Sequence, residues 1–295
     1  MGYFETILVI AGLNVILALS VFTTLAVGQF SLAQVGFWAI GAYLSAILTT
    51  MFGWPLGLAL AASALTCCVI SLGVGYPCLR IRGMYLAMAT LGFSESVRVL
   101  LLNLDWQILV DGVKVGPNGV LGFRGIAVQT QTWHVFLFVA VLLAGFAYLG
   151  RTRLGQAMAA IREDEVAAQS AGVDIVRVKV LAFMAGAAIA GVGGGLYANY
   201  MSYLIAHDFG FHLTLVAILF VALGGVEVFW GPVLGAVLLT VIPEYIRFLQ
   251  DYRMIFYGLA VMVVIVLRPK GLLEAGTLAS IARWVRPGRA DERPR

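Results

Sequence analysis

Charged residues are scarce in this sequence of 295 residues. Only 12% of the residues are Asp, Glu, Lys or Arg, whereas 61% are hydrophobic and the mean hydropathy is +0.97. A soluble domain usually has about a quarter of its residues charged, so this chain has too few charges to cover a surface that faces water. No charge at all occurs over the 74 residues between Glu5 and Arg80. Because about 20 helical residues cross a bilayer core, this stretch has room for three crossings.

Motifs for catalysis and metal binding are also missing. The sequence contains no phosphate-binding loop ending in Gly-Lys-Ser/Thr, no Gly-x-Ser-x-Gly elbow and no His-Glu-x-x-His. Cys67 and Cys68 are adjacent and Cys78 stands alone, all within or at the end of apolar runs, which favours plain packing over metal ligation. We therefore predict no enzyme activity, no metal site and no bound cofactor in this chain, so any energy source must come from elsewhere.

What the sequence does contain is a series of long apolar segments. Residues 7–27 and 56–74 are apolar on nearly every side, whereas strands of a membrane β-barrel alternate apolar and polar residues. Lipid-facing helices fit these runs better. The segments are expected near 6–27, 32–51, 55–78, 84–104, 132–150, 180–200, 213–228, 231–246 and 254–268. The sequence thus predicts an all-α polytopic membrane protein with about eight to ten transmembrane helices in one transmembrane domain, residues 1–273.

Basic residues indicate how this domain is oriented, because short cytoplasmic loops collect Lys and Arg. Such residues occur at Arg80 and Arg82, five times in the loop 151–179, and seven times against three acids from Arg268 onward. These regions are predicted to be cytoplasmic, and 274–295 to be a flexible basic tail. The loops 105–131 and 199–212 are predicted to be external. Three spans before Arg80 then place the amino terminus outside, and the positive net charge needs no nucleic-acid partner.

Two glycine-bearing polar patches interrupt the apolar segments. One is Gly28-Gln29-Phe30-Ser31-Leu32-Ala33-Gln34-Val35-Gly36, and the other is Gly224-Gly225-Val226-Glu227-Val228-Phe229-Trp230-Gly231-Pro232. Broken membrane helices usually line a cavity, because their free backbone groups need polar partners. A Phe-Trp motif follows the first patch at 37–42. A similar motif begins inside the second patch, at 229–236. This repetition indicates two pseudo-repeated halves. Candidate residues of a translocation pathway are Gln29, Ser31, Gln34, Gly224, Gly225 and Glu227; a purely structural role for the patches stays open.

Two charges in the fourth segment can neutralise each other. Glu95 and Arg98 are three residues apart, which puts them on one face of a helix. An unpaired charge in the membrane costs about 2.5–3.5 kcal/mol on insertion scales. We expect an ion pair at a helix interface, with a role in gating as the alternative.

The loop 151–179 carries nine charges and is predicted to contain a helix over Gln156–Ala171, which ends at Gly172. Leu154, Met158, Ile161 and Ala168 fall on one face of it. Beside that face lie Arg162, Glu163, Asp164 and Glu165. A helix resting on an anionic membrane surface would be expected to carry basic residues instead. The acidic run therefore favours docking to another protein over a solvated interfacial helix.

Several short sequence motifs resemble those of a known family. They are Gly28-Gln29-Phe30-Ser31-Leu32, Gly41-Ala42-Tyr43, Gly83-Met84-Tyr85-Leu86-Ala87-Met88-Ala89-Thr90-Leu91, Gly116-Pro117-Asn118-Gly119, Arg151-Thr152-Arg153-Leu154-Gly155-Gln156-Ala157, Ala159-Ala160-Ile161-Arg162-Glu163-Asp164-Glu165, Trp230-Gly231-Pro232-Val233-Leu234-Gly235-Ala236 and Leu267-Arg268-Pro269-Lys270-Gly271-Leu272. In order and spacing they resemble the permeases of branched-chain amino acid ABC importers, over about residues 5–273. Within that family the chain is most similar to the LivM-type subunit.

This resemblance implies a permease subunit in a plasma (inner) membrane that forms half of a pathway for Leu, Ile or Val. The implied partners are a second, LivH-type permease, two cytoplasmic ATPases that bind ATP and Mg, and an extracytoplasmic solute-binding protein. The helix around Arg162 to Gly172 then resembles the coupling helix that contacts an ATPase. The family often has Gly-His where this chain has Ala33-Gln34, which keeps urea, amides and other carboxylates open as solutes.

One alternative is a stand-alone secondary carrier or channel for a small neutral solute such as urea or an amide. An ion-coupled carrier usually needs an ionisable residue near the middle of the membrane. Glu95, Asp208 and Glu227 are the candidates for that role. A membrane-embedded enzyme is a weaker alternative, because the clustered polar residues that intramembrane chemistry requires are missing.

Overall fold

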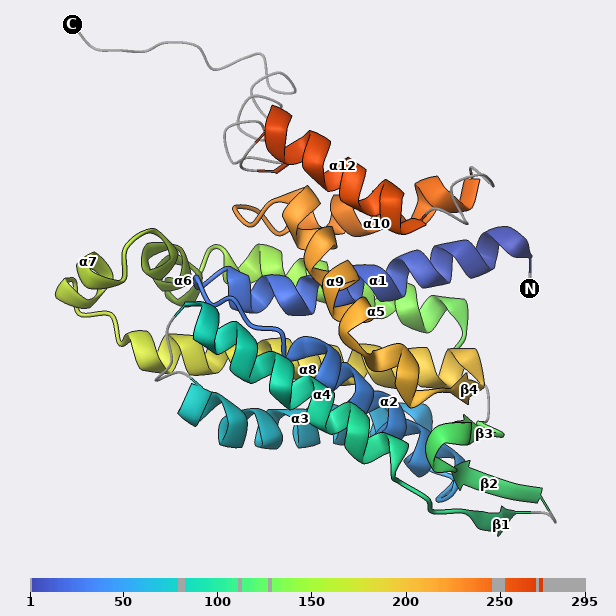
Figure 1. Ribbon diagram of the computed structural model, residues 1–295. Coiled ribbons are helices and arrows are strands. Elements are labelled where there is room, and N and C mark those ends of the chain that lie inside the picture. Colours follow the sequence, from blue (N-terminus) through green and yellow to red (C-terminus); the bar gives the residue numbers. More distant parts are fainter. Residues whose placement is uncertain are drawn as a thin grey trace, which may run out of the picture.

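The computed structural model describes residues 2–78, 83–110, 113–126, 129–245, 253–268 and 271–272. Long helices lie side by side in an elongated bundle, with a small β-sheet at one end and two short helices at the other (Figure 1). The long helices are α1 (Tyr3–Leu25), α2 (Gln34–Thr50), α3 (Leu56–Cys78), α4 (Met84–Leu102), α5 (Thr132–Leu149), α8 (Ile175–Met201), α9 (Phe211–Gly224), α10 (Trp230–Tyr245) and α12 (Arg253–Leu267).

The predicted helical membrane architecture is confirmed, because one of these helices covers most of each of the nine predicted apolar segments. Helices α1, α3, α4, α5 and α8 are long and apolar enough to cross a membrane, and α9, α10 and α12 contain shorter apolar helices. Helix α8 begins at Ile175, five residues earlier than the predicted segment. Several predicted features lie outside the described residues: Arg80, Arg82, Asp111 and the tail 274–295.

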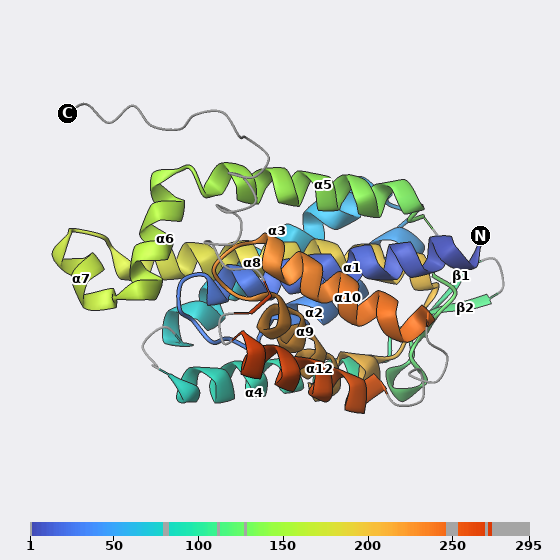
Figure 2. The same cartoon turned by 90° about the horizontal axis from the view of Figure 1, so that it is seen from above.

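The centre of the bundle is formed by α8, which packs against α1, α2 and α3. Helix α5 instead runs along one edge and is mostly exposed (Figure 2). Glycines on α8 allow unusually close contact with α2: a Cβ built on Gly194 would lie 2.0 Å from the carbonyl oxygen of Trp38. Small residues at such crossings let two helix backbones touch, which is how membrane helices gain packing energy.

A buried polar cluster also joins α2 to α8. The Asn199 Nδ2 atom donates to Ser45 Oγ at 2.9 Å, and Thr49 Oγ1 donates to Asn199 Oδ1 at 2.9 Å. All three residues are fully or almost fully buried. The amide nitrogen and the amide oxygen of Asn199 both have hydrogen-bond partners. The cluster therefore holds the two helices in one register and leaves neither of these buried polar atoms unpaired.

A four-stranded antiparallel sheet, which the sequence analysis did not predict, connects two loops. Its strands, in spatial order, are β1 (Ile108–Val110), β2 (Val113–Pro117), β3 (Phe123–Arg124) and β4 (Tyr203–Leu204), with the short 3-10 helices η1 (Gly119–Leu121) and η2 (Ala206–Phe209) beside it. Phe123 pairs with Leu204 across the sheet. The loops 105–131 and 199–212 therefore lie on the same side of the bundle, as predicted, and α1 begins at that same end (Figure 1).

Candidate functional site

The predicted docking helix is in fact two helices. Helix α6 (Arg153–Glu163) ends where α7 (Glu165–Ser170) begins, and Asp164 lies between them in an extended conformation. Its Oδ1 atom accepts hydrogen bonds from the backbone N–H groups of Val166 at 2.8 Å and Ala167 at 3.0 Å. An Asp side chain at this position is a favourable helix N-cap. The predicted continuous helix over 156–171 is therefore wrong, because Asp164 starts a new helix instead of continuing the first.

The charged residues of this segment point in different directions. Glu163 and Asp164 are exposed at the end of the molecule, whereas Arg162 and Glu165 are half-buried. Glu165 forms an ion pair with Lys179 of α8. Gly172 ends the segment at a positive φ of 83°, where a glycine is favoured. Met158, Ile161 and Ala168 are buried, as predicted for the apolar face.

The first glycine-bearing patch forms a non-helical connection that re-enters the bundle. Helix α1 ends at Leu25, Gly28 adopts a φ of 70°, and α2 begins only at Gln34. The three predicted pathway residues of this patch are all buried: Gln29, Ser31 and Gln34. No described residue forms a hydrogen bond with either amide atom of the Gln34 side chain. Buried amides without partners are rare in native structures and merit a functional explanation.

Two hydroxyl groups of α4 support this connection, and neither was among the predicted site residues. Thr90 Oγ1 accepts a hydrogen bond from the N–H group of Leu32 at 2.9 Å. Ser94 Oγ accepts from the N–H group of Gly36 at 3.2 Å and donates to the carbonyl of Leu32 at 2.8 Å. Thr90 and Ser94 are four residues apart in an apolar helix, so they share a face. That spacing is the signal that could have identified them.

The second patch connects α9 to α10 by a similarly tight route. A Cβ built on Gly224 would lie 2.0 Å from the carbonyl oxygen of Gly231, so the two helices touch at this point. Gly225 follows with a φ of 99°. A Cβ built on Gly271 would lie 2.4 Å from the Gly225 Cα atom, which places the chain after α12 against the same connection. Gly224 and Gly225 are buried, and Glu227 is half-buried.

Arg162 of α6 lies between the two patches. Its Nη1 atom donates to the carbonyl oxygen of Val226 at 2.6 Å. On the other side, a Cβ built on Gly28 would lie 3.7 Å from the Arg162 Cα atom. A single residue of the helix pair α6–α7 thus contacts both breaks in the bundle, although Arg162 was predicted to belong to the docking segment together with the acidic residues.

A cavity of about 300 Å³ lies beside Arg162, at the α6 end of the bundle. Phe146 is central to its aromatic wall: its ring centroid is 5.8 Å from that of Phe22 and 6.2 Å from that of Phe229. Arg162 and Glu227 contribute opposite charges to the lining. The cavity therefore combines an apolar wall with one cationic and one anionic side chain.

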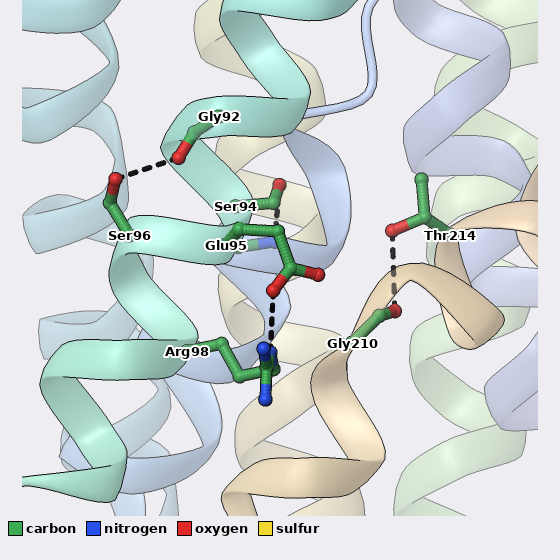
Figure 3. Close-up of polar contacts among 8 residues, drawn as sticks. Gly92, Ser94, Glu95, Ser96, Arg98, Gly210 and Thr214 are labelled. Atoms are coloured by element: carbon green, nitrogen blue, oxygen red, sulfur yellow. Dashed lines mark hydrogen bonds and ion pairs between the residues drawn. The ribbon is translucent and has the colours of Figure 1, made fainter.

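The ion pair predicted on α4 is confirmed. Arg98 Nε lies 2.6 Å from Glu95 Oε2. Figure 3 shows both side chains extending from α4 toward Gly210 and Thr214 at the start of α9. A Cβ built on Gly210 would lie 3.4 Å from Arg98 Cδ, so the arginine packs on that turn. The pair lies away from α6, which favours its structural interpretation.

Comparisons with known proteins agree on one family. The family described as "Branched-chain amino acid transport system / permease component" matches residues 3–266. The high-affinity branched-chain amino acid permease proteins LivM of Salmonella typhimurium and Escherichia coli are 34% and 33% identical over 89% of this chain. The chain spans 66% of the length of each, slightly less than two thirds. No solved structure matches the chain.

A more distant relative transports a different solute, according to its name. The autoinducer 2 import system permease protein LsrC of Klebsiella pneumoniae is 29% identical over 54% of this chain and 45% of its own length. Permeases related to this chain are thus named for both amino acids and an autoinducer.

Proposed function

Because the chain belongs to the branched-chain amino acid transport system / permease component family, we propose that it is one permease subunit of an ATP-driven importer for Leu, Ile or Val. The solute class rests on the two LivM relatives, which are 33–34% identical over most of the chain. The proposed partners are a second permease of LivH type, two cytoplasmic ATPases that bind ATP and Mg, and an extracytoplasmic binding protein.

The observation that carries this proposal is the position of α6 and α7. These short helices project from one end of the bundle (Figure 1), and Arg162 links them to both broken-helix connections. We assign this end to the cytoplasm, since basic loop residues favour that side, and the sheet end to the outside. An ATPase that displaced α6 would then act directly on the two breaks.

The pathway roles of Gln29, Ser31, Gln34, Gly224, Gly225 and Glu227 are part of the same proposal. Helix breaks offer backbone groups and buried amides to a solute that carries no net charge. The unpartnered Gln34 amide suits that role best among them, because a solute or water molecule would satisfy it.

Purification of the tagged chain from its native membrane in mild detergent tests the function. We expect mass spectrometry to identify two ATPases and a second permease in the same complex, and uptake by the reconstituted complex to require ATP. A chain that purifies alone, with uptake that survives ATP removal but collapses with the proton or sodium gradient, would instead indicate a secondary carrier.

Charge changes at the α6–α7 junction test the docking surface. The double variant Glu163→Lys, Asp164→Asn keeps a residue type that can cap α7 but replaces two negative charges at this exposed tip. We expect the amount of co-purifying ATPase to fall about tenfold, because losing charge complementarity with a basic docking surface, or facing like charges across it, weakens binding. Gln169→Lys is the matched control, since it adds a positive charge at an exposed position of α7. Unchanged ATPase binding and uptake in the double variant would contradict the assignment.

A further inference from the structure

A second cavity lies toward the sheet end of the bundle, among α1, α2, α8, η2 and the start of α9. Its volume is about 140 Å³. One water molecule occupies about 30 Å³ in the liquid, so the cavity has room for an amino group and several attached atoms. Its lining is Ile10, Leu13, Asn14, Trp38, Tyr197, Asp208, Phe209 and Leu213. No residue in this lining carries a positive charge.

Three aromatic side chains form much of its wall. The Trp38 and Tyr197 ring centroids are 6.3 Å apart, and the Tyr197 and Phe209 centroids are 6.1 Å apart with the rings nearly perpendicular. Trp38 and Phe209 are almost fully buried, so these rings are fixed by the surrounding bundle. Aromatic faces attract cations within about 6 Å, and desolvated sites attract them more strongly.

Two hydrogen-bond acceptors complete the lining. Asn14 Nδ2 donates to Thr240 Oγ1 at 2.9 Å, which leaves its Oδ1 atom as an acceptor. Asp208 reaches the surface from η2, and no described residue forms a hydrogen bond or ion pair with its carboxylate. Partial burial raises the pKa of Asp208 above its ordinary value, while His207 lowers it. The carboxylate is thus an exposed anionic acceptor at the edge of the cavity, where a cationic ligand can reach it.

We propose that this cavity binds the ammonium group of a free amino acid at the outward end of the subunit. Asp208 and Asn14 accept its hydrogen bonds, and the rings of Trp38, Tyr197 and Phe209 stabilise its charge. The inference rests on the proposed function for the identity of the solute, and it adds the group that this subunit recognises. Solute leaving a binding protein on the sheet side would meet the Asp208 carboxylate first.

Analogues that lack one charged group test the proposal. The purified complex in lipid nanodiscs, without its binding protein, is titrated with leucine, with 3-methylbutylamine and with 4-methylpentanoate. We expect leucine and the amine to bind and the acid, which has no ammonium group, to bind about tenfold more weakly or not at all. Equal binding of the acid and the amine would overturn the proposal.

Point variants of the lining residues test whether the solute binds in this cavity. Asp208→Asn should weaken binding of leucine and the amine about tenfold, and Tyr197→Leu should weaken both, whereas Tyr197→Phe keeps the ring and should bind as the wild type does. Asp105→Asn is the matched control, because Asp105 lies in the loop before the sheet and outside the cavity lining. Wild-type affinity in Asp208→Asn would refute the site. ATPase activity of each complex reports assembly, so failure of this inference is distinguishable from failure of the importer function.

Discussion

Replacing Arg162 with alanine is expected to lower solute uptake about tenfold or more while the ATPases stay bound and continue to hydrolyse ATP. The variant removes the hydrogen bond from Nη1 to the Val226 carbonyl oxygen. A hydrogen bond from a charged group contributes about 1.5–3 kcal/mol, and 1.4 kcal/mol corresponds to a factor of ten. Without this contact, movement of α6 would no longer be transmitted to the connection between α9 and α10. The measurement is solute transported per ATP hydrolysed in proteoliposomes.

Two further variants separate this transmission from simple folding. Arg162→Lys retains one cationic donor, so we expect partial recovery of the transport-to-ATP ratio. Arg153→Ala removes an exposed arginine from the start of the same helix and should leave that ratio unchanged. A wild-type ratio in Arg162→Ala would show that the contact with Val226 has no part in coupling.

The second large effect is expected at the contact of α8 with α2. In Gly194→Ala the new Cβ atom would lie 2.0 Å from the carbonyl oxygen of Trp38 and 3.0 Å from the N atom of Ala42. Overpacking typically costs about 1–3 kcal/mol, and backbone atoms cannot rotate away as a side chain can. We therefore expect the free energy of unfolding to fall by at least about 3 kcal/mol. The measurement is the yield of monodisperse protein in fluorescence-detected size-exclusion chromatography, which should be reduced.

Gly92→Ala provides the control for this prediction. Gly92 lies within α4, and a Cβ at that position has no atom within 4 Å. Alanine is favoured over glycine in a helix by about 1 kcal/mol, so this variant should be neutral or slightly stabilising. Opposite signs for the same chemical change would assign the effect to helix contact, and equal yields would contradict it.

The sequence predicted the helices well because membrane burial imposes a strong local signal. Each long apolar run must satisfy its backbone hydrogen bonds internally, which leaves helices as the solution for segments such as 6–27. The sheet carried no comparable signal: β3 and β4 have two residues each and pair across about 80 residues of chain. Pairing between such distant short strands depends on the tertiary structure.

The candidate site was predictable in part. The glycine-rich patches indicated where helices break, because glycine and polar residues are conspicuous in an apolar segment. The contact of the Arg162 side chain with Val226 was not predictable. The helical periodicity of a sequence shows which residues share a face, but it does not show which element packs against that face. Asp164 illustrates a second limit: its side chain can satisfy the N–H groups of a new helix, and that local choice overrides the continuous pattern around it.

The small sheet has a mechanical consequence. Backbone pairing of Phe123 with Leu204 and of Arg124 with Tyr203 ties the chain between α4 and α5 to the chain between α8 and α9. The N–H group of Thr130 also donates to the carbonyl oxygen of Asn199, just before α5. Helices fastened together at one end can separate most at the other. We therefore expect the helices of this subunit to pivot about the sheet end. The largest displacement is then expected next to α6, at the greatest distance from the sheet, where a force applied by a partner would have the greatest effect.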